Sequence, residues 1–282
     1  MPSPTLFIGL VSHERTGYAD SLGSEGLAQR LQRAFGDAHL VVNTRNLADE
    51  QGIDLSRRTV QSSLSAEMRA DRQWGRFLGR DTGARWWLNH IFRRMRRLGR
   101  LFVSPPVSTV RRLINIELSH IDLLRQGLDS GAPWILVLED DAGCHDVNEL
   151  SEGLRCLIQS ANGEGLVNLS ESFTFDELGV TRLLTADDRM QWAEDSGSTV
   201  LRCELPATNT VCAILYSRGA AQQILAELER IPLEPVLPID WKLNVALMRL
   251  HESTGGSEIS SWFVHPAPIQ QRSMKAPGIL PT

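Results

Sequence analysis

The chain has 282 residues, 42% of them hydrophobic and 22% charged, which suffices to bury the core of one large α/β domain. Its net charge of −5 argues against bulk affinity for nucleic acid, so no nucleic-acid partner is expected. Four scattered cysteines without a C-x-x-C pair predict neither a disulfide framework nor a zinc site. No apolar run approaches the roughly 20 residues that span a bilayer. We therefore expect a cytoplasmic protein, at most peripheral at the inner face of the membrane.

The N-terminal part of the chain has the pattern of a parallel sheet. Residues 6–11 form a short apolar run that predicts a buried strand. A helix ending at Gly36 and a second strand at residues 40–42 follow. Strand, helix and strand of these lengths open a mostly parallel sheet flanked by helices, and we predict a single domain over residues 1–282.

Residues 67–112 form a basic, aromatic-rich segment that we interpret as a helical insert within that domain. The segment holds twelve arginines against three acidic residues. On a helix, Trp87, Ile91 and Met95 would share one face, with arginines largely off it. Such a helix could bind an anionic membrane surface. Alternatively, its apolar face packs on the sheet and its arginines face solvent.

The second half of the chain alternates predicted strands and helices. Ser217 is the candidate N-cap of one of these helices. The expected elements are a helix at 110–128, a strand at 134–138, a helix at 150–160, strands at 165–169, 200–205 and 212–216, a helix from 218, a helix at 241–250 and a strand at 261–264.

Three carboxylates, Glu139, Asp140 and Asp141, directly follow the most apolar predicted strand. In open α/β sheets, ligands bind beyond the carboxyl ends of the strands. A divalent cation relieves the repulsion between crowded carboxylates, and Mn²⁺ and Mg²⁺ prefer oxygen ligands. The triplet therefore predicts a metal site in which Glu139 and Asp141 point the same way. The alternative is a solvated acidic turn.

Several stretches in the same part of the chain resemble the family 25 glycosyltransferases, which include lipooligosaccharide galactosyltransferases of bacteria and collagen galactosyltransferases of animals. The similarity covers roughly residues 110–275. The stretches are Leu-Ser-His at 118–120, Ser-Gly-Ala at 130–132, Leu-Glu-Asp-Asp at 138–141, Ala-Ile-Leu-Tyr-Ser-Arg-Gly-Ala at 213–220, Pro-Ile-Asp at 238–240 and Pro-Ile-Gln-Gln-Arg-Ser at 268–273. The N-terminal part departs from the family pattern, since Gly9 replaces an asparagine and the basic segment is additional.

The resemblance implies a GT-A fold, which is a Rossmann-like α/β sandwich. It also implies a hexosyltransferase that moves sugar from a UDP-sugar donor to a glycan or glycolipid acceptor, with inversion and with Mn²⁺ or Mg²⁺. By the same resemblance, Ser119, His120 and Asp140 belong to the donor pocket. Gly9 could allow close approach of the nucleotide or merely pack, and Arg15 lies in a loop where phosphates would be approached.

Inverting transfer needs a base that accepts the proton of the acceptor hydroxyl. Asp240 is the candidate, in the Pro-Ile-Asp stretch at the start of a predicted helix, although a carboxylate there could serve only as an N-cap. Glu171, after the strand at 165–169, is the alternative base. His265 could complete the metal shell as an imidazole ligand, or it could simply be exposed to solvent.

Two other function classes fit the same sequence. A chain with this fold could bind nucleotide sugars or glycans without catalysing transfer, because fold does not determine function. It could also act as a peripheral membrane adaptor through the basic segment.

Overall fold

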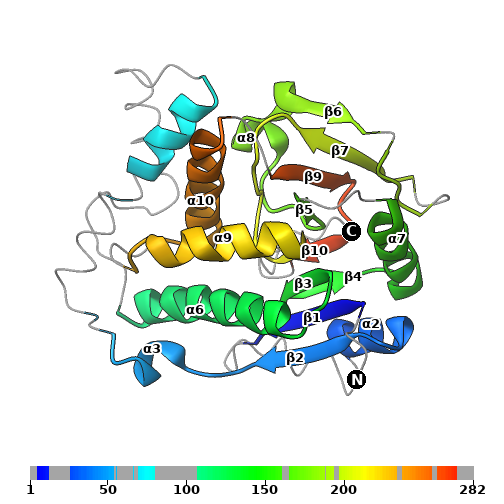
Figure 1. The fold of residues 1–282 in the computed structure, drawn as a ribbon, viewed down its shortest axis with the longest axis horizontal. Coiled ribbons are helices and arrows are strands. Elements are labelled where there is room, and N and C mark those ends of the chain that lie inside the picture. Colours follow the sequence, from blue (N-terminus) through cyan, green and yellow to red (C-terminus); the bar gives the residue numbers. More distant parts are fainter. Residues whose placement is uncertain are drawn as a thin grey trace, which may run out of the picture.

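The computed structural model describes residues 5–12, 26–53, 55, 66, 69–79, 107–160, 165–187, 189–193, 197–233, 237–255 and 259–271. They form an α/β structure built on an eight-stranded sheet (Figure 1). Within these residues, no helix has the length and apolar character needed to cross a membrane. Arg15 and residues 80–106, including Trp87, Ile91 and Met95, lie outside the described part of the chain.

The central sheet is mixed, with most of its strands pointing one way. Its order is β2-β1-β3-β8-β5-β9-β7-β6, and β8 and β7 run antiparallel to both of their neighbours. The strands are β1 (Leu6–Val11), β2 (His39–Asn43), β3 (Trp134–Glu139), β5 (Gly165–Asn168), β6 (Leu184–Ala186), β7 (Thr199–Cys203), β8 (Ala213–Ser217) and β9 (Ser260–His265). A separate two-stranded sheet pairs β4 (Ala142–Cys144) with β10 (Ile269–Gln271). The predicted α/β sheet is confirmed, and β1 and β2 are parallel as expected.

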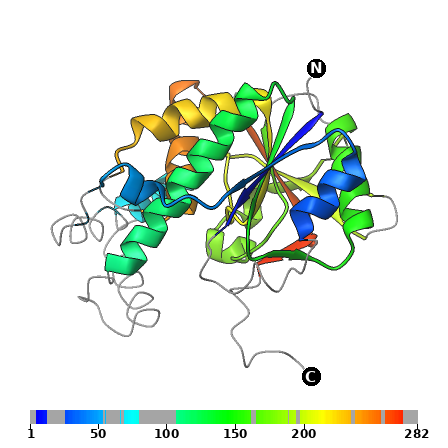
Figure 2. The same cartoon turned by 90° about the horizontal axis from the view of Figure 1, so that it is seen from below.

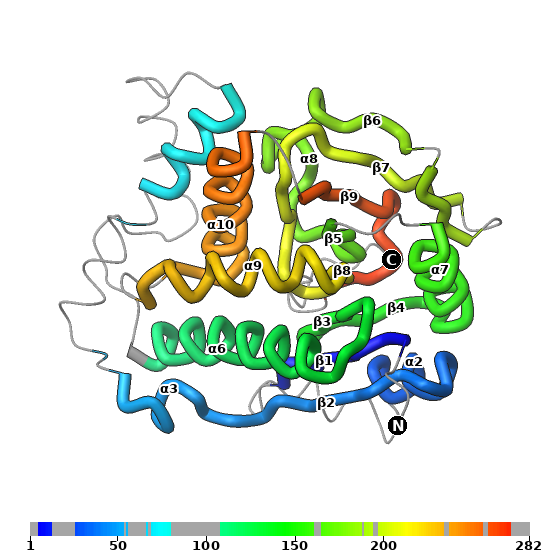
Figure 3. Tube along the Cα trace, in the orientation of Figure 1, coloured from blue at the N-terminus to red at the C-terminus, as the bar shows by residue number. Residues whose placement is uncertain are grey.

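Helices cover both faces of the sheet. They are α2 (Leu27–Phe35), α3 (Leu47–Glu50), α6 (Val107–Asp129), α7 (Val147–Ser160), α8 (Phe175–Leu178), α9 (Arg218–Arg230) and α10 (Ile239–Ser253), with a 3-10 turn, η1 (Thr181–Leu183). Figure 2 shows α6 and α9 on one side of the strands and α2 and α7 on the other. The tube in Figure 3 follows α6 and α9 side by side, with α10 meeting α9 about midway along its length. Ser217 caps α9 as predicted, because its hydroxyl accepts from the backbone N–H of Ala220 at 3.3 Å.

The central strands are buried on both faces, which explains their nearly continuous apolar sequences. In β3, Ile135 and Val137 join the core beneath α6, α9 and α10, whereas Leu136 and Leu138 join the core beneath α2 and α7. This alternation follows the two-residue period of a strand. Glu139 is the last residue of β3, so its position is fixed by a strand that is packed on both faces.

The described start of the basic segment is packed against the protein. Residues 69–77 are helical, and Ala70 and Trp74 are buried in the core under this helix. The indole N–H of Trp74 donates to the carbonyl oxygen of Leu178 at 3.2 Å. Arg72 and Arg76 are exposed on the opposite face. For this helix the structure shows the packed arrangement, so its apolar face is not available to a membrane.

Helix α6 approaches β1 and β3 closely because glycine lies at two contact points. A Cβ on Gly9 of β1 would lie 3.1 Å from Leu123, and a Cβ on Gly127 of α6 would lie 2.8 Å from Ile135. In this structure Gly9 packs against Leu123 and so admits α6, as the packing alternative expects. This close packing sets the distance between α6 and the end of β3.

We expect Gly127→Ala to destabilise the protein by about 1–3 kcal/mol, the usual range for overpacking a core. Alanine favours a helix over glycine by roughly 1 kcal/mol, so a loss of stability would show that the contact with Ile135 dominates. Urea unfolding measures the effect. In an Ile135→Ala background, which removes the Cδ1, Cγ1 and Cγ2 atoms that the new methyl meets, Gly127→Ala should no longer destabilise the protein. A single variant as stable as the parent would contradict the close-packing argument.

Candidate functional site

A cleft of about 190 Å³ lies at the carboxyl end of β3. Its walls come from α6, the turn after β3, the segment before β8, the start of α10 and the end of β10. The residues that line it are Arg112, Leu113, Ile116, Glu139, Asp140, Asp141, Thr210, Val211, Pro238, Ile239, Asp240 and Gln271. The structure thus brings the acidic triplet and Asp240 together, as the sequence analysis expects of a metal site and its base.

Within the cleft, Glu139 and Asp141 converge. Glu139 pairs with Val11 of β1, while Asp140 and Asp141 form a turn and are only 4% and 5% exposed. One ligand atom from each of Glu139, Asp141 and Cys212 lies within 4.8 Å of the other two. This buried group of donors could hold a metal ion. The alternative of a solvated acidic turn is wrong, because Asp140 and Asp141 are buried.

Cys212 is the member of this group that the sequence analysis misses. It precedes β8, which is antiparallel to β3, and its carbonyl accepts from the N–H of Glu139 at 2.9 Å. Its Sγ lies 3.6 Å from Oδ1 of Asp141. Burial, followed by the charges of Glu139 and Asp141, raises the pKa of the Cys212 thiol well above its usual value. A bound cation would favour the thiolate, because coordination promotes loss of the thiol proton.

His120 supports the acidic triplet from α6. Its side chain is almost fully buried, and its Nε2 lies 3.3 Å from Oε1 of Glu139. Because an ionised carboxylate only accepts hydrogen bonds, this contact requires a proton on Nε2. The bond orients the Glu139 carboxylate, as hydrogen bonds from neighbouring side chains commonly orient metal ligands. Ser119 is buried beside His120 in α6.

Asp240 lies in the first turn of α10, and it does not cap that helix. The N-cap position is Pro238, without a side-chain capping bond, and α10 begins at Ile239. Burial, then the negative charge of Glu139, raises the pKa of the Asp240 carboxyl to about 6. The capping alternative considered for Asp240 is therefore wrong, and burial beside Glu139 leaves its carboxyl with a raised pKa.

A buried ion pair joins α6 to α10 behind the cleft. The ammonium of Lys242 donates to both carboxylate oxygens of Glu117 at 2.5 and 2.7 Å, and both side chains are 1% exposed. It also lies 3.3 and 3.4 Å from the carbonyl oxygens of Pro232 and Leu233, between α9 and α10. Since Glu117 is one turn from His120 and Lys242 is two residues from Asp240, this pair ties together the two helices that carry them.

The segment before β8, which supplies Thr210 and Val211 to the cleft, is held by buried amides. Asn244 of α10 accepts from the N–H of Thr208 at 2.9 Å and donates to its carbonyl at 3.1 Å. The Thr208 hydroxyl donates to Oδ1 of Asn168 at 2.7 Å. These hydrogen bonds fix the backbone conformation of the segment that forms this wall of the cleft.

The structure separates Glu171 and His265 from the acidic group. Nδ1 of His265 lies 3.6 Å from Oε2 of Glu171, and the His265 side chain is 48% exposed. The His265 ring also contacts Phe175, with 5.1 Å between ring centroids. His265 is not part of the donor group formed by Glu139, Asp141 and Cys212, and Glu171 does not line the cleft around them.

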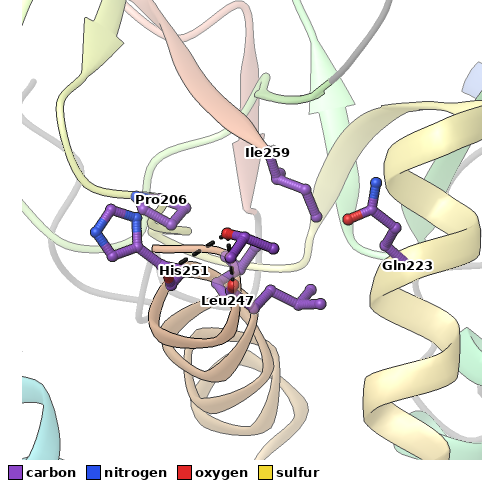
Figure 4. Close-up of a pocket in the computed structure, with 7 residues that line it drawn as sticks. Pro206, Gln223, Leu247, His251 and Ile259 are labelled. Atoms are coloured by element: carbon purple, nitrogen blue, oxygen red, sulfur yellow. Dashed lines mark hydrogen bonds between the residues drawn. The ribbon is translucent and has the colours of Figure 1, made fainter. Parts of the chain in front are cut away.

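A second crevice lies between α9 and α10, and Figure 4 shows Gln223 on one side of it and Leu247 on the other, with the His251 ring beside Pro206. It is too narrow for a water molecule. The Nδ1 atom of His251 is buried without a hydrogen-bond partner among the described residues, and the ring packs edge-on against Phe77. This crevice is a packing feature, so the acidic cleft remains the candidate site.

Comparison of the sequence with models of protein families and with curated proteins finds no match.

We expect Asp240→Asn to stabilise the protein above pH 6 in the presence of a chelator. A carboxyl with a raised pKa binds a proton more tightly in the folded state, so its contribution to stability falls as pH rises from about 4 to about 6. The amide lacks this dependence. Urea unfolding should show a gain of about 1–2 kcal/mol at pH 8, after allowance for partial exposure, and little difference near pH 4. A difference that does not change with pH would contradict the assignment.

Proposed function

We propose that this protein is a metal-dependent glycosyltransferase that moves a sugar from a UDP-sugar to a glycan or glycolipid acceptor with inversion. The observation that carries the proposal is the meeting of Glu139, Asp141 and Asp240 in one cleft at the carboxyl end of a central strand. The resemblance of residues 110–275 to family 25 glycosyltransferases, which implies a GT-A fold, supports the choice of reaction.

Glu139 and Asp141 would hold Mn²⁺ or Mg²⁺, with Cys212 as a third donor. Two carboxylates suit either ion, and each ion would still have positions for water and for phosphate oxygens. A sulfur ligand favours the softer Mn²⁺ over Mg²⁺. Bound there, the ion would supply Lewis-acid stabilisation to a departing diphosphate. The hydrogen bond from His120 keeps the Glu139 carboxylate turned toward the site.

Asp240 would act as the general base. With a pKa of about 6, its carboxyl is mostly ionised at neutral pH and retains more basicity than an ordinary aspartate. It lies on α10, across the cleft from the end of β3, so the acceptor hydroxyl would lose its proton on the side opposite the metal. That separation of roles is what an in-line, inverting displacement requires.

Asp141→Asn should abolish Mn²⁺-dependent binding of UDP while the fold stays intact. Losing a ligand should cost more than the roughly 10–100-fold that follows disturbance of an outer-shell partner. Isothermal titration with Mn²⁺, and with UDP in the presence of Mn²⁺, measures both affinities. Asp129→Asn, which makes the same charge change at an exposed position on α6, should bind like the parent. Parent-like binding by Asp141→Asn would remove this residue from the metal site.

Asp240→Asn should lower the rate of sugar transfer by about 10²–10⁴-fold, the usual contribution of a general base. UDP and Mn²⁺ affinities should stay close to those of the parent, because the base acts on the acceptor hydroxyl. Glu171→Gln is the matched control and should retain activity, since Glu171 pairs with His265 outside the cleft. Loss of transfer in Glu171→Gln, with normal activity in Asp240→Asn, would reverse the assignment of the base.

A further inference from the structure

Charge in the cleft is distributed unevenly. Glu139, Asp140, Asp141 and Asp240 give it four carboxyl groups, and Arg112 is the one cation among the described residues that line it. In the sequence, Arg112 is the last residue of the basic segment, and no local pattern predicts a role for it. Because it lines this acidic cleft, Arg112 could contact a ligand that binds there.

Arg112 reaches the cleft from the same helix that supports the acids. Arg112, Leu113 and Ile116 of α6 all line it, and His120 contacts Glu139 two turns further along. Eight residues of helix span about 12 Å, so Arg112 lies at one end of the cleft and the acidic group at the other. Unlike the buried acids, its side chain is exposed, which leaves it accessible to a ligand.

The cleft can bind an anion only after the negative charge of its carboxylates has been largely offset. Without a cation, the acidic triplet repels any phosphate. A divalent ion at Glu139 and Asp141 and the guanidinium of Arg112 together offset three of the four carboxylate charges of the cleft. Only then is the cleft neutral enough for an anionic ligand, which would meet the ion at one end and the guanidinium at the other.

We propose that Arg112 binds a phosphate group of the donor, as the counterpart of the metal ion at the far end of the cleft. This inference rests on the proposed function. A guanidinium suits the role because it forms paired, charge-assisted hydrogen bonds to phosphate oxygens. Leu113, Ile116 and Val211 form an apolar wall beside it, which favours a ligand that carries a less polar portion next to its phosphates.

The neighbouring arginine provides a matched control. Arg111 is also exposed on α6, but its Nε lies 3.4 Å from Oδ1 of Asp49 in the short helix α3. Arg111 is therefore directed away from the cleft. Substitution of either arginine by glutamine removes the same charge from the same turn of the helix, so only an effect specific to Arg112 bears on the proposal.

The experiment compares the parent, Arg112→Gln and Arg111→Gln by titration with Mn²⁺ alone and, in the presence of Mn²⁺, with UDP, UMP, uridine and pyrophosphate. For Arg112→Gln we expect UDP and pyrophosphate affinity to fall by about 10–100-fold, the loss typical of a hydrogen bond to a charged group. Mn²⁺ alone should bind at least as tightly as in the parent, because a nearby positive charge is gone. Uridine affinity should not change, and Arg111→Gln should match the parent throughout.

The other possible results distinguish the role of Arg112 from the proposed function. Equal UDP affinity in Arg112→Gln and the parent would overturn the role of Arg112 and leave the proposed function standing. UDP binding in the presence of Mn²⁺ that depends on Arg112, without sugar transfer to any acceptor, would support the role of Arg112 and overturn the proposed transferase activity. A parent that binds neither UDP nor pyrophosphate with Mn²⁺ would overturn both. Weaker Mn²⁺ binding in Arg112→Gln would show a disturbed site and count against a phosphate contact.

Discussion

Repulsion between carboxylates is the constraint around which this end of the molecule is built. Glu139 and Asp141 converge on one point, and burial, followed by the charge of Glu139, raises the pKa of the Asp240 carboxyl. Such an arrangement destabilises the fold, because charged groups in a buried site prefer to be apart or solvated. The sheet tolerates it since β3 is packed on both faces and paired on both edges. Unfavourable electrostatic interactions of this kind are typical of sites that bind a cation or transfer a proton.

Much of this arrangement can be predicted from local sequence. Six consecutive apolar residues mark β1 without error, and the apolar run before Glu139 marks β3 to within one residue. Ser217 is recognisable as a cap because its short hydroxyl precedes a helical pattern. The acidic triplet is visible because its position, right after a buried strand, is itself local information. Asp240 is recognisable through its resemblance to a family motif, and its capping alternative fails because α10 begins at Ile239, two residues before the predicted start.

The remaining features depend on contacts that local patterns do not encode. Cys212 meets Asp141 only because β8 inserts antiparallel beside β3, an order that the apolar pattern of β8 does not reveal. The pairing of β10 with β4, which brings Gln271 to the cleft, involves strands of three residues, too short for any periodicity. His265 lies outside the donor group and contacts Glu171 and Phe175 instead. In each case the partner is far away in sequence, and side-chain type alone does not identify it.

The ion pair between Glu117 and Lys242 has a consequence for how sequences of this fold can change. Both charges are out of water, so removal of one leaves the other uncompensated, at a cost of about 3–5 kcal/mol. That is a large part of the roughly 5–15 kcal/mol by which a typical domain is stable. Joint replacement by apolar residues need not carry this cost. The two positions are therefore expected to covary, and a lineage that loses the pair must cross a poorly folding intermediate or change both residues almost at once.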